Sequence, residues 1–282
     1  MDFEKIEVST QTFTVRSNIK NIDLMKFFNH LQLTEQILCI KYKMLQKGEC
    51  FSKKHKKLVS TEKNTWKNFL NCITLVVQVE KKVNIKIFKN GVFQLTGCKH
   101  VTDVKCSLDL IIRRLSKLSE CFSLSLENTE ASPFVIYIKS AMRNIDFDLG
   151  FKINRTVLSN YLHHHTIYVV PPLISNMGVK LKIPIDNLET LPITKITYDR
   201  KTLEPQEEIL TYAQYVAESD LEQKKNKDKF VSITVFQNGK VLMSAIDKTY
   251  QKVYYQWFVD MINTIGTELT NVDLPKKTFK IF

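Results

Sequence analysis

The chain has 282 residues, of which 44% are hydrophobic, and a formal net charge of +12. This is enough apolar material to bury a sizeable core, in one large domain or in two fused halves. The basic excess makes a polyanion the expected class of partner, although on charge alone a generic solvated basic surface explains it equally well. No apolar run reaches membrane-spanning length and residues 1–5 do not resemble a signal peptide, so we expect a soluble intracellular protein.

The motifs that are missing argue against an enzyme. The sequence has no Walker loop, Gly-x-Ser-x-Gly, His-Glu-x-x-His or dinucleotide fingerprint, and its seven glycines leave little material for a phosphate cradle. The six cysteines include no Cys-x-x-Cys pair, so we expect reduced thiols rather than a zinc ribbon or a redox motif. His163, His164 and His165 are consecutive and cannot converge on one ion from a regular element. We therefore expect no catalytic residue, no cofactor and no metal site.

In chain order, the first half contains a lysine-rich segment at 43–66 without apolar periodicity, which indicates an exposed basic loop. The next element is a β-hairpin at 83–96, in which two alternating strands flank an Asn-Gly turn. Its apolar residues share one face, whereas Phe88 lies on the other, polar face. An amphipathic helix at 99–118 follows and covers the apolar face.

The second half contains a segment at 186–229 with a short strand at 194–198, a helix-like run at 208–222 and a lysine-rich end. We interpret this segment as a second insertion in the form of a solvated loop. It is followed by another hairpin with an Asn-Gly turn at 231–244 and by an amphipathic helix at 248–265. The apolar stripe expected on that helix consists of Val253, Trp257, Met261 and Ile265.

The two hairpin-and-helix units form an internal repeat. Phe88 and Phe236 occupy the same position in each copy, at the turn end of a solvated face. Taken singly, an aromatic side chain at a strand end is more often covered by a loop or a partner, but the repetition favours a surface that binds another molecule. Two copies indicate a duplicated α+β protein, because a solenoid would need three or more. We place the first repeat at 1–125, with insertion 43–66, and the second at 126–282, with insertion 186–229.

The hairpins resemble a known family. Phe88-Lys-Asn-Gly-Val-Phe-Gln-Leu-Thr-Gly-Cys-Lys99 is similar to a segment of the TATA-box-binding protein (TBP) family, and 236–244 is similar to its second copy. Segments 69–74 and 150–155 resemble the divergent TBP-like transcription factors of nucleocytoplasmic large DNA viruses. The resemblance implies a pseudo-twofold saddle with one curved antiparallel sheet, helices on the convex face and a bare concave face.

The function that the resemblance implies is transcription initiation. Such a factor binds and bends A·T-rich double-stranded promoter DNA through the minor groove and recruits a TFIIB-like factor and a multisubunit RNA polymerase. We expect a monomer with an internal pseudo-dyad, in the viral factory of the host cytoplasm or in the host nucleus, with packaging in the virion left open. The alternative is a saddle-shaped interaction platform for polymerase or initiation factors with little or no sequence-specific DNA binding. A third hypothesis, a module of a nucleic-acid-processing enzyme, lacks any attached catalytic motif.

The family's site residues carry over by position. The residues that fall at DNA-intercalating positions are Phe69, Phe88, Leu173, with Ile174 beside it, and Phe236. Those at minor-groove positions are Gln94, Thr96, Asn144, Leu242 and Ser244. The expected phosphate-binding residues are Lys53, Lys54, Lys56, Lys57, Lys86, Lys99 and Lys240. The expected partner-binding residues on the helix at 99–118 are Arg113, Arg114 and Lys117. Lys86 and Gln94 replace apolar residues of the family, and Val92 and Asp247 replace lysines, so the first half of the groove face is more polar than the family pattern.

Overall fold

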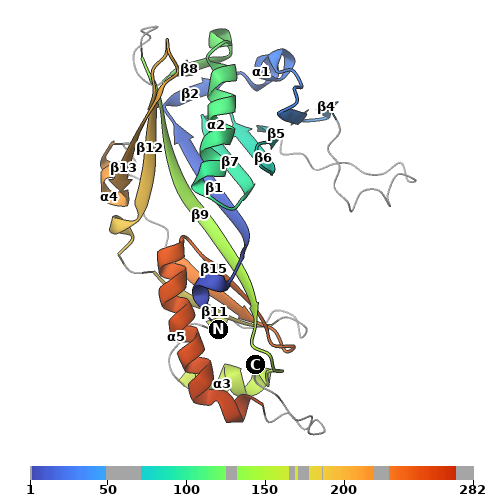
Figure 1. Ribbon diagram of the computed structural model, residues 1–282, viewed down its shortest axis with the longest axis vertical. Coiled ribbons are helices and arrows are strands. Elements are labelled where there is room, and N and C mark those ends of the chain that lie inside the picture. The colour runs from blue at the N-terminus through green and yellow to red at the C-terminus, as the bar shows by residue number, and fades with distance from the viewer. Residues whose placement is uncertain are drawn as a thin grey trace, which may run out of the picture. The chain divides into compact units, whose positions relative to one another are not determined.

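The computed structural model describes residues 2–48, 71–124, 132–164, 169–170, 178–185, 187–218 and 229–270 (Figure 1). The chain folds into two compact units. The first unit comprises residues 10–141 and 187–225, and the second comprises 1–9, 142–186 and 226–282. Two long strands, β1 (Val8–Ser17) and β9 (Phe134–Asp148), contribute residues to both units.

The sheet of the first unit follows the order β9-β1-β7-β6-β5-β3-β4. Its remaining strands are β3 (Ile37–Tyr42), β4 (Leu45–Gly48), β5 (Cys72–Gln78), β6 (Lys82–Phe88) and β7 (Val92–Cys98). β6 and β7 form the expected antiparallel hairpin. Its turn needs glycine, since Gly91 has a φ of 70° and a Cβ there would lie 2.2 Å from the carbonyl oxygen of Ile19. A separate two-stranded sheet joins β2 (Ile19–Ile22) to β8 (Phe122–Leu124).

Two helices lie against the first unit's sheet on its core side. α2 (Val101–Leu115) packs against β7 and buries Val104, Leu108, Ile111 and Leu115, the stripe that helical periodicity predicts. α1 (Leu24–His30) buries Leu24, Phe27 and Phe28. Lys47 donates to the last carbonyl groups of α1, at 2.7 Å from the oxygen of Phe28 and 2.8 Å from that of Leu31. The first part of the predicted basic loop is therefore strand β4, and its Lys47 caps the carboxyl-terminal end of α1.

The second unit repeats this arrangement. Its sheet order is β9-β15-β14-β11-β10, with β10 (Val169–Val170), β11 (Val179–Pro184), β14 (Phe230–Val235) and β15 (Lys240–Ala245). α5 (Lys248–Leu269) packs on β15 and β14, and α3 (Arg155–His164) packs on α5 and β11. The short helix η1 (Phe3–Lys5) brings Phe3 to 5.3 Å from the ring of Tyr255 on α5. In both units a helix follows the same hairpin and covers the same side, which confirms the predicted duplicated α+β fold.

The prediction is wrong for one residue of the apolar stripe on α5. Val253 is 61% exposed, whereas the buried face of α5 includes Tyr255, Phe258 and Ile262. Residues spaced by four advance 400° around a helix, or 40° past one full turn, so a stripe built only from such steps drifts off the core. Met261 and Ile265, at the end of the predicted stripe, are buried as expected.

The segment interpreted as a solvated loop at 186–229 is ordered structure over residues 187–218. It contains η4 (Leu188–Thr190), β12 (Pro192–Tyr198), β13 (Pro205–Thr211) and α4 (Tyr212–Glu218). β12 pairs with the amino-terminal half of β9 and carries Ile196 and Tyr198 into the core that α2 covers. The loop interpretation is therefore wrong for these residues, and the helix-like run from 208 begins as a strand. This hairpin is part of the first unit's core.

The cysteines differ in state. Cys72, Cys98, Cys106 and Cys121 are free thiols, and the first, second and fourth of them are buried. Cys39 is disulfide-bonded, so the prediction that all cysteines are reduced is wrong for this residue. Among the described residues no helix is both long and apolar enough to cross a membrane.

Candidate nucleic-acid interface

The side of the first unit's sheet that faces away from α2 is lined by polar side chains. Cross-strand pairing aligns them in rows, with Thr12, Thr96, Asn84 and Val76 in one row and Thr14, Gln94, Lys86, Thr74 and Lys41 in the next. We call these positions, together with Arg16, Lys82 and Phe88 on the same strand faces, the first open face. Over β1, β3, β5, β6 and β7 it carries four cationic side chains and no carboxylate: Arg16, Lys41, Lys82 and Lys86. Such a surface suits a polyanion.

Phe88 lies at the turn end of this face, as the sequence predicts. It pairs with Cys72 across β5 and β6 and is half-buried. Its ring lines a hollow of about 1190 Å³, together with Asn71, Lys89 and the first residues of α1. Burial raises the pKa of the neighbouring Cys72 thiol, so this cysteine stays neutral beside the aromatic ring.

The equivalent side of the second unit's sheet has the same rows. Asn144 is aligned with Ser244, Ser232 and Lys182, and Asp146 with Leu242, Thr234 and Lys180. We call these positions, together with Asp148, Phe236 and Lys240, the second open face. Phe236 is 37% exposed and lines a hollow of about 1020 Å³ with Arg155, Lys240 and Leu242. Each unit thus places a phenylalanine beside a surface hollow at the same end of the same hairpin.

The two open faces differ in charge. The second one carries exposed carboxylates at Asp146 and Asp148, which alternation along β9 directs to the same side as Asn144. Both carboxylates line the hollow beside Phe236. The cations of this face, Lys180, Lys182 and Lys240, lie on the neighbouring strands β11 and β15. A phosphate backbone would meet a more favourable potential on the first open face than on the second.

Asn144 has unused hydrogen-bonding capacity. Among the described residues, its Oδ1 is the one buried side-chain oxygen or nitrogen without a hydrogen-bond partner. Its backbone carbonyl accepts a hydrogen bond of 3.1 Å from the hydroxyl of Ser9. A buried amide group that lacks a partner costs free energy, so such a group calls for an explanation, and a bound ligand is one. The family resemblance predicts a polar groove contact at this position.

The remaining predicted residues fall into three sets. Phe69, Leu173, Ile174, Lys53, Lys54, Lys56 and Lys57 lie outside the described residues. Lys99, which follows β7, and Lys240, the first residue of β15, are exposed. Gln94, Thr96, Leu242 and Ser244 are half-buried on the open faces. Arg113 and Arg114 lie on α2, on the other side of the sheet, and Lys117 follows that helix. Arg113 forms an ion pair of 2.8 Å with Asp109.

Several charged residues of the open faces were missed from sequence. Lys41, Lys180 and Lys182 lie on short strands beside the hairpins, and Asp146 and Asp148 lie on β9. The alternation of Asp146, Phe147 and Asp148 is a period-two signal that could have identified the two carboxylates. The strands that carry the lysines become visible only once the sheet order is known.

No family model matches the chain. It is 26% identical over 299 residues to uncharacterized protein 335L of Invertebrate iridescent virus 6, covering 95% of this chain and 87% of that protein. It is 30% identical over 117 residues to the TATA-box-binding protein-like protein of Acanthamoeba polyphaga mimivirus, covering 37% of this chain and 31% of that protein. Methanococcus jannaschii TBP matches with a TM-score of 0.41 and 15% identity, over 93% of this chain and 98% of that one.

Proposed function

We propose that this chain, which is TBP-like and related to proteins of large DNA viruses, is a transcription initiation factor that binds and bends A·T-rich double-stranded DNA. The observation that carries the proposal is the repeated placement of Phe88 and Phe236. Each lies at the turn end of a hairpin, on the side away from the covering helix, and each lines a hollow. A duplicated wedge is what a protein needs to open two base steps of one duplex.

In the proposed complex the open faces lie in a widened minor groove. Each phenylalanine wedges between two base pairs, which costs a few kcal/mol of unstacking per step and is offset by the surface that bent DNA brings into contact. Pyrimidine–purine steps such as TA open most cheaply, so deformability favours A·T-rich sites. The hydroxyl and amide groups of Thr96, Asn144 and Ser244 face the groove floor, where they distinguish A·T from G·C pairs.

Phosphate contacts supply the part of the affinity that does not depend on sequence. Lys86 and the exposed Lys99 and Lys240 are the candidates on the described strands and at their ends, with the lysines of 53–57 as further candidates from sequence. Because such contacts release counterions, the affinity should fall steeply with salt. On the helix side, Arg113, Arg114 and Lys117 form the proposed docking site for a TFIIB-like factor and RNA polymerase.

A second candidate function is an interaction platform that keeps the fold without wedging DNA. The observation that favours it is the pair of carboxylates, Asp146 and Asp148, on the second open face. Carboxylates next to a phosphate backbone oppose binding. The two candidate functions differ in one measurable property, the bend of a bound duplex.

The experiment that tests the proposal compares A·T-rich and G·C-rich duplexes at two salt concentrations. Fluorescence transfer between dyes at the two DNA ends reads both affinity and bend. We expect the unmodified chain to bind and bend the A·T-rich duplex, and the double variant Phe88→Ala, Phe236→Ala to lose the bend and a few kcal/mol of binding free energy. Val253→Ala, at an exposed position on α5, is the matched control. Equal bending by the double variant and the unmodified chain would contradict the wedge role, and binding without any bend would favour the platform.

A further inference from the structure

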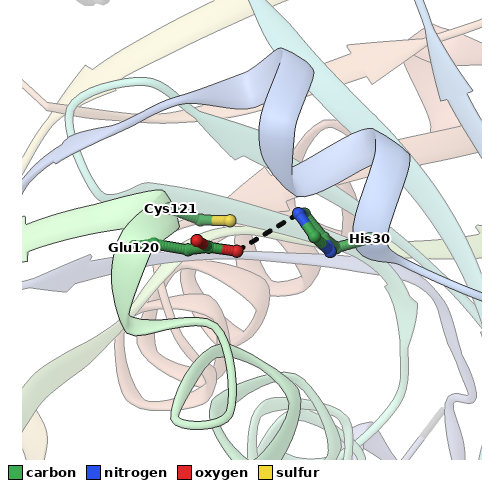
Figure 2. A group of neighbouring side chains, drawn as sticks. All are labelled: His30, Glu120 and Cys121. Carbon is green, nitrogen blue, oxygen red and sulfur yellow. Dashed lines mark ion pairs between the residues drawn. The ribbon is translucent and has the colours of Figure 1, made fainter.

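The first unit contains a cluster of three side chains that differ in chemistry and come from distant parts of the sequence. His30 is the last residue of α1, and Glu120 and Cys121 end the short helix η3 (Ser119–Cys121). The Nε2 of His30 lies 3.2 Å from the Oε1 of Glu120. One ligand atom from each of the three residues lies within 4.8 Å of the others. Figure 2 shows the carboxylate, the sulfur and the imidazole gathered at one place between the two elements.

This set of atoms fits zinc better than Mg²⁺ or Ca²⁺. Nitrogen, oxygen and sulfur are its usual protein ligands, and tetrahedral bonds of about 2.0–2.2 Å separate two light ligand atoms by roughly 3.3 Å. The separation of 3.2 Å between His30 and Glu120 matches this edge. A thiolate ligand disfavours Mg²⁺ and Ca²⁺, which prefer oxygen. Three protein ligands leave the fourth position to water.

The backbone holds the three residues in place. The amide of Cys121 donates to the carbonyl of Leu118 at 2.9 Å, and its own carbonyl accepts from the amide of Asp23 at 2.8 Å. α1 is anchored by Phe27, which is fully buried, so its last turn has little freedom to move. Ligands on fixed elements lose little entropy when they bind an ion. Only side-chain rotation is then needed to bring the sulfur to bonding distance.

Access and charge also suit a cation. The side chains of His30 and Glu120 are 48% and 63% exposed, so an ion can enter from solvent, whereas Cys121 is buried at the edge of the hydrophobic core. The carboxylates of Glu120 and Asp23 act electrostatically on the sulfur of Cys121, and Lys26 partly offsets them. The same carboxylates make the surroundings of the sulfur attractive to a divalent ion.

We propose that His30, Glu120 and Cys121 bind one zinc ion, with water as the fourth ligand, and that the ion fastens α1 to η3. The zinc site can be tested without the proposed DNA binding. It has a structural consequence near Phe88, because Asp23, Leu24 and Met25 at the other end of α1 line the hollow beside that ring. Zinc would fix this wall of the hollow.

Cobalt serves as the spectroscopic probe. Metal-free full-length protein is titrated with Co²⁺ under nitrogen without added thiol, and Zn²⁺ is then added to displace the cobalt. We expect one equivalent of Co²⁺ to bind, with a thiolate-to-cobalt charge-transfer band in the near ultraviolet and visible bands of tetrahedral strength. Zn²⁺ should remove both signals and raise the melting temperature of the protein.

Matched variants separate this site from other ligands of the chain. Cys121→Ser should abolish the charge-transfer band. Glu120→Gln changes an exposed side chain and leaves the fold intact. It should weaken metal binding by at least the roughly tenfold loss that removal of an outer-shell partner causes. Cys106→Ser removes an exposed free thiol of α2 and should change nothing. Retention of the band in Cys121→Ser, its loss in Cys106→Ser, or unchanged affinity in Glu120→Gln would overturn the proposal. So would the absence of any cobalt–thiolate band in the unmodified protein.

Discussion

Single residues hold the elements on which the open faces depend, and Asp103 is the clearest case. Its carboxylate accepts from the amides of Lys99 at 2.8 Å and His100 at 3.1 Å, and it lies 3.1 Å from the Nζ of Lys81. The side chain is only 6% exposed. Burial would raise its pKa, but the hydrogen bonds from the amides of His100 and Lys99 and the contact with Lys81 outweigh burial and lower it. The charged carboxylate therefore fixes the start of α2 at the end of β7.

Asp103→Asn should lower the free energy of unfolding at pH 7 by about 1–2 kcal/mol, since a charged acceptor of several hydrogen bonds is lost. The folded-state pKa lies below the ordinary value of 3.8, so this stabilisation is present above that value and is lost as the pH falls through the folded pKa. The difference between the two proteins should shrink below about pH 4. Urea denaturation at pH 7 and at pH 3 measures it, with Asp260→Asn on the exposed face of α5 as the control. A difference that is equal at both pH values would show that the charge is not its source.

Asp146 is the residue whose charge most directly opposes the proposed function. It lies on the second open face, in the same cross-strand row as Leu242, and lines the hollow beside Phe236. Asp146→Asn keeps the shape and should strengthen binding to all duplexes by about 1 kcal/mol, the scale of one exposed charge near another in water. Asp260→Asn changes the net charge equally but on α5, so it should have a much smaller effect. Fluorescence anisotropy at low salt measures both, and equal gains would mean that net charge alone matters.

At the scale of elements, the hairpin of β12 and β13 decides the stability of the first unit. Ile196 of β12 is 1% exposed within the core, whereas Ile209 of β13 is 77% exposed. Ile196→Ala should cost about 2–5 kcal/mol of unfolding free energy, since it leaves a cavity. Ile209→Ala should cost less than about 0.5 kcal/mol. Chemical denaturation distinguishes them, and equal midpoints would mean that the segment at 187–218 is not part of the core.

The same elements show why sequence predicted some parts and not others. The hairpins at 83–96 and 231–244 were predictable because each has an Asn-Gly turn between strands whose alternate residues are buried. β13 was not, because its first five residues are exposed and, among the described strands, it pairs with β12 alone. β13 forms a strand because it pairs with β12, and the local sequence pattern does not reveal this pairing. The placement of Lys41 and Lys180 on the open faces depends in the same way on the order of the strands in the sheet.

At the scale of the whole molecule, the two repeats are not equivalent. The charged side chains of the first open face on its five strands are all cations, whereas the second open face also carries the carboxylates of Asp146 and Asp148. The predicted outer wedges differ as well, with Phe69 in the first repeat and Leu173 in the second, both outside the described residues. An aromatic ring in a base step retains stacking that an aliphatic side chain cannot provide. We therefore expect the two ends of a bound DNA site to be kinked unequally, with the shallower kink at the second repeat.

Leu173→Phe should make the kinks at the two ends of the DNA site more nearly equal. A second aromatic wedge at that end should deepen the kink and tighten binding, because more stacking is kept when the step opens. Fluorescence transfer between a dye at the centre of the duplex and a dye at one end, measured for each end in turn, reports the two kinks separately. Val253→Phe adds an aromatic ring at an exposed position of α5 and should leave both kinks unchanged. If Leu173→Phe leaves the kink unchanged or weakens binding, then either the assignment of position 173 to the outer wedge is wrong or the second repeat does not wedge DNA.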